Sequence, residues 1–158
     1  MKKSVIIGVS FGITSGIITA LGLMVGMAFA TNSKILVIGS LLTIAVADSL
    51  SDSLGIHISE EADKSTTTRG VWESTIATFL AKFLFTMTFI IPIYFLNLKF
   101  AVLVNIIWGL IVLCFLSFFV AKESREKPFD AIFEHLFIAV IVLVATYFIG
   151  GFISTSFV

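Results

Sequence analysis

Five long apolar segments limit the fold of this 158-residue chain more than any other feature. They cover about residues 4–30, 35–58, 71–96, 100–121 and 129–158. Each segment is long enough to cross a hydrocarbon layer about 30 Å thick as an α-helix. The sequence therefore predicts an all-α polytopic membrane protein, with a single transmembrane domain that occupies residues 1–158.

The composition supports this class of protein. Hydrophobic residues make up 58% of the chain, charged residues 13%, and the mean hydropathy is +1.13, whereas soluble domains carry about 25% charged residues. The formal net charge of zero provides no basic surface for nucleic acid. The single cysteine, Cys114, excludes a disulfide framework. Because the sequence has no nucleophile–base arrangement, phosphate loop or H-E-x-x-H motif, we expect neither an enzyme nor a permanently bound cofactor.

The N-terminal segment has two interpretations. Lys2 and Lys3, the apolar stretch and the run Ala28–Ala30 together resemble a signal peptide with a small-residue cleavage site. The stretch is, however, far longer than the about 7–15 apolar residues of such a peptide, and it carries regularly spaced glycines. We therefore expect the first helix to be retained.

Basic residues predict the orientation in the membrane. If the N-terminus is cytoplasmic, seven basic residues lie inside and only Lys34 and Lys99 lie outside. The inner residues are Lys2, Lys3, Lys64, Arg69, Lys122, Arg125 and Lys127. Because basic residues concentrate in cytoplasmic loops, we expect the N-terminus in the cytoplasm and the protein in the plasma membrane of a prokaryote.

Two acidic residues interrupt the second apolar segment. Asp48 and Asp52 are four residues apart and therefore lie on one face of a helix. A carboxylate in hydrocarbon costs roughly 2.5 kcal/mol or more, so this pair needs a cation, a proton or a path for water.

A lysine in the third segment lies at a similar depth. Lys82 is ten residues from Trp72, or about 15 Å, and Asp48 is nine residues from His57, or about 13 Å. Lys82 is therefore expected to form a structural ion pair with Asp48 or Asp52, and this pairing leaves one carboxylate over for proton exchange. Ser15 lies at the same depth in the first segment.

A second polar group lies at the cytoplasmic end of the helices. His57, Glu60, Glu61 and Glu134 combine imidazole and carboxylate groups, which suit Fe(II) or Mn(II). Their spacing matches no tight metal motif, so a solvated acidic loop is the alternative.

The glycines of the first segment predict close helix packing. Spacings of four relate Gly8, Gly12 and Gly16, and again Gly22 and Gly26, and such small residues let a second helix approach. This packing occurs either within one chain or across a dimer. Ser15 and Thr19 lie on or beside that face, where their oxygens can line a transport pathway.

Several runs of the sequence carry a familiar pattern in order and spacing. Residues 14–26 (TSGIITALGLMVG) resemble N-D-G-L-V-T-T-F-A-L-V-A-G, and residues 50–59 (LSDSLGIHIS) resemble L-S-M-A-A-G-E-Y-V-S. Residues 90–94 (IIPIY) resemble I-P-L-L-P-Y, while EHLFI and ATYFIG in the last segment resemble E-x-L-x-I and A-x-x-Y-x-I-G. These are motifs of the vacuolar iron transporter family, which the chain resembles over nearly its whole length.

This resemblance implies a homodimer with a metal path between protomers, which exports ferrous or related ions from the cytosol in exchange for protons. The chain departs from the family pattern at three site positions. Ser15 stands where the family has Asp, Asp52 where it has Met, and Ile56 where it has Glu. The family's large cytoplasmic metal-binding insertion is absent, because only residues 60–70 separate the second and third helices. The resemblance thus implies a divergent member.

Together, these features predict a proton-coupled transporter that exports Fe2+ or Mn2+. Asp48 and Asp52 are its expected intramembrane ligands or proton acceptors. Two alternatives remain open. One is a non-transporting scaffold or partner subunit held together by a Lys82–Asp pair. The other is a carrier of another solute, such as an organic cation.

Overall fold

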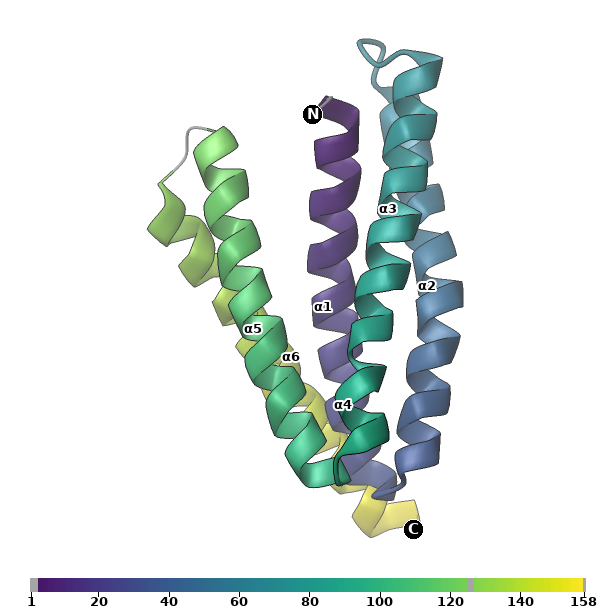
Figure 1. Cartoon of the computed structure of the whole chain (residues 1–158), viewed down its shortest axis with the longest axis vertical. Coiled ribbons are helices and arrows are strands. Elements are labelled where there is room, and N and C mark those ends of the chain that lie inside the picture. Colours follow the sequence, from purple (N-terminus) through teal and green to yellow (C-terminus); the bar gives the residue numbers. More distant parts are fainter. Residues whose placement is uncertain (1–2, 125–126, 158) are drawn as a thin grey trace.

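The computed structural model describes residues 3–124 and 127–157, and all regular structure within them is helical. The helices are α1 (Lys3–Thr31), α2 (Lys34–Ala62), α3 (Thr68–Thr88), α4 (Ile90–Phe95), α5 (Leu98–Glu123) and α6 (Pro128–Phe157). Figure 1 shows them as a bundle whose N-terminal end holds the starts of α1, α3 and α6. Lys2 and Arg125, two of the predicted inner basic residues, lie outside the described residues.

Five spans in the described part of the chain are long and apolar enough to cross a membrane, with α3 and α4 together forming the third. This confirms the predicted all-α polytopic fold. The observed ends differ from the predicted ones by one to three residues at most positions. The largest difference is at α2, which continues to Ala62 rather than ending near residue 58. Glu60, Glu61 and Ala62 favour a helix, so α2 extends beyond its apolar part.

Short, locally hydrogen-bonded connections join antiparallel neighbours. Between α1 and α2, Asn32 adopts a left-handed φ of 48°, which asparagine tolerates better than most residues, and its N–H donates to Ala28 O at 3.0 Å. Before α5, the Asn97 side chain caps the helix by accepting from the Phe100 N–H at 3.0 Å. Both connections form hairpins, as their lengths predicted.

Helix α1 is the centre of the bundle. Its first half packs on α3, its second half packs on α6, and α2 lies against both α1 and α3. The hairpin of α5 and α6 contacts α1 only along the second half and diverges from it toward the N-terminal end (Figure 1). The apolar core therefore lies in the second half, where Leu21 and Met24 are fully buried with Leu41, Phe89 and Leu113.

The glycines of α1 divide between two neighbours. A Cβ on Gly12 would lie 2.6 Å from Thr78 O, and Gly8 and Gly16 also face α3. Gly22 instead faces α6, where a Cβ would lie 2.8 Å from a methyl group of Val142, and Gly26 packs against Thr146 in the same helix. The predicted packing role is thus observed within one chain, with different partners for the two sets.

A break at Phe89 separates α3 from α4. Pro92 has no N–H to bond the Thr88 carbonyl, and its ring crowds that carbonyl, so the helix cannot continue regularly. The Asn105 amide of α5 donates to the next carbonyl, Phe89 O, at 2.7 Å and so ties α5 to the break. It also contacts Met24 Sδ at 3.2 Å. Neither this break nor its bracing by Asn105 was predicted from the sequence.

Replacing Asn105 with leucine is expected to lower the free energy of unfolding by about 2 kcal/mol, because Phe89 O would lose its donor in a buried position. The measurement is SDS-induced unfolding of the purified protein in micelles. The exposed cap variant Asn97→Leu is the control and should cost less. Equal losses in the two variants would show that Asn105 does not brace the break.

Candidate intramembrane ion site

A row of polar residues lies buried along one face of α3. Ser74, Thr78, Lys82 and Thr86 follow one another at spacings of four, and each is at most 1% exposed. Gly8, Gly12 and Gly16 of α1 face this row. Because they have no side chains, α1 approaches α3 closely. Lys82 therefore lies in the interior of the bundle, with its stem against α1.

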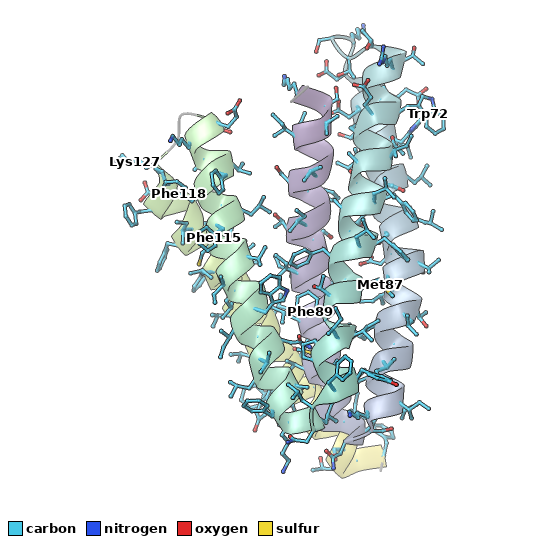
Figure 2. The ribbon with its side chains drawn as sticks, in the orientation of Figure 1. Trp72, Met87, Phe89, Phe115, Phe118 and Lys127 are labelled. Atoms are coloured by element: carbon cyan, nitrogen blue, oxygen red, sulfur yellow. The ribbon has the colours of Figure 1, made fainter. Side chains whose placement is uncertain are left out.

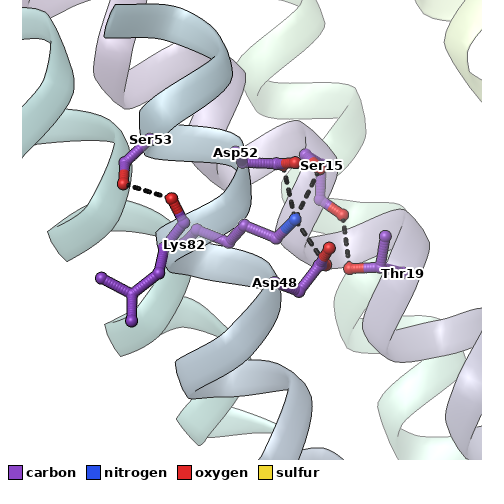
Figure 3. Close-up of polar contacts among 7 residues, drawn as sticks. Ser15, Thr19, Asp48, Asp52, Ser53 and Lys82 are labelled. Atoms are coloured by element: carbon purple, nitrogen blue, oxygen red, sulfur yellow. Dashed lines mark hydrogen bonds and ion pairs between the residues drawn. The ribbon is translucent and has the colours of Figure 1, made fainter.

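The Lys82 ammonium contacts three oxygens from two other helices (Figure 3). Its Nζ lies 2.5 Å from Oδ2 of Asp48, 2.5 Å from Oδ2 of Asp52 and 2.9 Å from Oγ of Ser15. A lysine has three N–H donors, so these contacts match its bonding capacity. The Asp48 contact is an ion pair without the alignment of a hydrogen bond, whereas Asp52 and Ser15 accept aligned ones.

Ser15 joins the first helix to the cluster. Its hydroxyl accepts from Lys82 and donates to Asp52 Oδ2 at 2.5 Å, so the three groups form a closed triangle. One turn later, Thr19 donates its hydroxyl to Ser15 O at 2.9 Å. Asp52 is consequently fixed by contacts with two helices, while Asp48 is held by its ion pair with Lys82.

The cluster carries more negative than positive charge. Two carboxylates share one ammonium, which leaves a formal excess of one negative charge. The predicted contact of Lys82 with an aspartate is confirmed, and the ammonium contacts both carboxylates, because α2 presents both on the face toward α3. Lys82 is 1% exposed, whereas the Asp48 and Asp52 side chains are 32% and 22% exposed, so a small solute reaches the acids before the amine.

His57 lies near the C-terminal end of α2, at the end of the bundle that holds the N-terminus, and it points toward α3. Its Nδ1 is 3.0 Å from Oγ1 of Thr75, and the single proton of that hydroxyl goes to Val71 O at 2.7 Å. Nδ1 is therefore the donor to Thr75. The ring also meets Trp72 edge-on, with 4.8 Å between centroids.

Three acidic residues that follow His57 in the sequence have different surroundings. Glu61 lines a small pocket of about 160 Å3 with His57, whereas Glu60 accepts a hydrogen bond from Thr66 Oγ1 at 3.3 Å. The backbone N–H of Ser65 bonds Asp63 Oδ1 at 2.9 Å and holds the pKa of that carboxyl below its usual range. Asp63 therefore remains an anion in this loop.

Glu134 is exposed on α6 and stands apart from the other predicted site residues. Figure 2 places Lys127, directly before α6, and Trp72, beside His57, on opposite sides of the end of the bundle that holds the N-terminus. The adjacent His135 bonds Ser117 of α5 at 2.8 Å. Within residues 3–124 and 127–157, no three acidic, histidine or cysteine side chains form a cluster suited to a metal ion.

Two buried hydroxyls beside the cluster were not predicted as site residues. Ser49 Oγ and Thr86 Oγ1 are buried in the described structure without a hydrogen-bond partner there. Thr86 lies four residues after Lys82, so its spacing indicates the same helix face. Ser49 gave no comparable signal, although it directly follows Asp48 in α2.

Comparison of the sequence with models of protein families and with curated proteins found no match. The resemblance to the vacuolar iron transporter family thus stays a prediction from the motifs.

Proposed function

We propose that this integral membrane protein exports a divalent metal ion, Fe2+ or Mn2+, from the cytosol of a prokaryote in exchange for protons. In this proposal it is a divergent, homodimeric relative of the vacuolar iron transporters in the plasma membrane. Asp48 and Asp52 bind the ion within the membrane. His57, Glu60, Glu61 and Glu134 raise the concentration of cations at the cytoplasmic end.

The convergence of three oxygens on one cation position carries the proposal. Asp48, Asp52 and Ser15 surround a point that the Lys82 ammonium occupies. Carboxylate and hydroxyl oxygens are ligands that Fe2+ and Mn2+ accept. The lysine stem has four rotatable carbons, so the ammonium can withdraw and leave a site of formal charge −2, which matches a divalent ion.

The same charges support coupling to protons. When the metal leaves, two carboxylates remain, and the returning Lys82 neutralises only one of them. A proton on the other carboxylate restores neutrality, as intramembrane acids do in proton-coupled carriers. In this cycle, release of the divalent ion requires the return of Lys82 and the uptake of one proton.

Metal flux is expected to depend on both aspartates. In proteoliposomes loaded with a metal-sensitive dye, Asp48→Asn and Asp52→Asn should each lower the initial rate of Mn2+ movement by at least about 10–100-fold, since loss of even an outer partner of a metal ligand has effects of this size. Asp130→Asn is the control, because Asp130 is exposed in the first turn of α6. The absence of wild-type flux above empty vesicles, or unchanged flux in both site variants, would refute the proposal.

The complete bonding of Lys82 favours a second candidate function. Lys82 has three oxygen partners and is 1% exposed. These contacts can fix the register of α1, α2 and α3 without any movement of the lysine. The protein would then be a scaffold or partner subunit that moves no ion. In that case, replacing all three charged residues with apolar ones preserves both stability and function, because well-packed apolar groups often substitute for a buried ion cluster.

A further inference from the structure

An open groove runs between α1, α2 and α6 and reaches the ion cluster from the side. Its volume is about 860 Å3. Leu23, Ile44, Val142 and Ile149 supply apolar walls from all three helices. The size falls in the range of about 300–1,000 Å3 that is typical of small-molecule pockets.

Asp48 is the only charged residue among those that line the groove. Its Oδ2 is buried against Lys82, yet the side chain is 32% exposed, so the exposed part belongs to the remainder of the carboxylate group and its stem. The cluster behind it carries a formal excess of one negative charge. The groove therefore combines a large apolar surface with one uncompensated charge at its edge.

We infer that the groove binds an amphipathic organic monocation that arrives from the lipid phase. The apolar body of the ligand lies between α2 and α6, and its single positive charge neutralises Asp48. This binding uses the outer side of the cluster, with Lys82 in place, and it involves Asp48, which the proposed metal site also uses.

Other occupants fit these features less well. A hydrated metal ion gains nothing from the apolar walls. An uncharged acyl chain covers the walls but leaves the excess negative charge of the cluster uncompensated in a water-poor setting, which is costly. A monocation with an apolar body satisfies both features at once.

Equilibrium binding of radiolabelled tetraphenylphosphonium to the protein in phosphatidylcholine nanodiscs tests the inference. We expect saturable binding, and we expect none for tetraphenylborate, which has the same shape and the opposite charge. Asp48→Asn should weaken tetraphenylphosphonium binding by about tenfold or more, because it removes a close charge pair from a medium of low dielectric constant. Asp130→Asn should leave binding unchanged.

A pair of aliphatic variants tests the place of binding without altering the ion cluster. Ala47 lines the groove beside Asp48, whereas its neighbour Val46 is exposed on α2 outside it. Ala47→Leu should weaken binding by about fivefold or more through lost volume, which is on the order of 1 kcal/mol, and Val46→Leu should not. These variants keep the test valid if Asp48→Asn fails to fold.

Three results would overturn the inference. Equal binding of the cation and the borate would show an apolar surface that does not select charge. Equal binding by the wild type and Asp48→Asn would remove Asp48 from the site. Absence of saturable binding would also refute it, and cross-linking of two chains through Ile44→Cys would then show that a second copy covers the groove. None of these results bears on Mn2+ flux, which is measured separately.

Discussion

Replacing Lys82 with methionine is expected to lower the free energy of unfolding by about 3–5 kcal/mol, which is the usual cost of removing one partner from a buried ion pair. The variant leaves Asp48 and Asp52 on one face of α2 with no cation between them. SDS-induced unfolding in micelles containing a chelator measures the effect. Lys99→Met, at an exposed position of α5, is the control and should change stability little.

Two additions to this experiment separate the candidate functions. If the oxygens of Asp48, Asp52 and Ser15 form a divalent cation site, Mn2+ should restore much of the stability that Lys82→Met loses, because the metal occupies the position of the ammonium. Mg2+ at the same concentration controls for ionic strength. If the cluster is purely structural, Mn2+ has no effect, and Lys82→Met with Asp48→Leu and Asp52→Leu recovers stability instead.

Replacing Gly12 with leucine is expected to lower the free energy of unfolding by about 3 kcal/mol, the upper end of the cost of overpacking. Even the Cβ atom would lie 2.6 Å from Thr78 O and 3.1 Å from Lys82 N, and both of these are backbone atoms that cannot turn away. The two helices must therefore separate, which also withdraws Ser15 from Lys82.

Gly55→Leu is the matched control for Gly12→Leu. A Cβ on Gly55 meets nothing within 4 Å, so the larger side chain enters open space and the helix gains a better helix former. Its stability should equal or exceed that of the wild type in the same SDS titration. Similar losses in the two variants would mean that the contact of α1 with α3 is looser than the structure indicates.

The sequence was sufficient to predict the spans and the centre of the candidate site. Apolar length identified all five spans, and the spacing of four placed both aspartates on one face. Counting residues from Trp72 and His57 brought Lys82 to the depth of Asp48. These predictions succeeded because helix rise and periodicity are local properties that the chain carries in each segment.

Features that depend on which helices meet were not predictable in this way. Glu134 has the residue type of a cation ligand, but the sequence did not show that the first part of α6, where it lies, diverges from α1 (Figure 1). The break at Phe89 follows from Pro92, yet its bracing needs Asn105 from a different span. The glycine spacings likewise did not indicate which helix each set would face, which is α3 for Gly8, Gly12 and Gly16 and α6 for Gly22 and Gly26.

The closed triangle of Lys82, Asp52 and Ser15 has a consequence for biogenesis. Its members come from three successive spans, and each charged one entering lipid alone costs about 2.5–3.5 kcal/mol. The cost falls only when all three helices are side by side. We therefore expect α3 to be less stable in the bilayer before α1 and α2 are beside it. The first three spans are thus expected to assemble in the membrane as one unit.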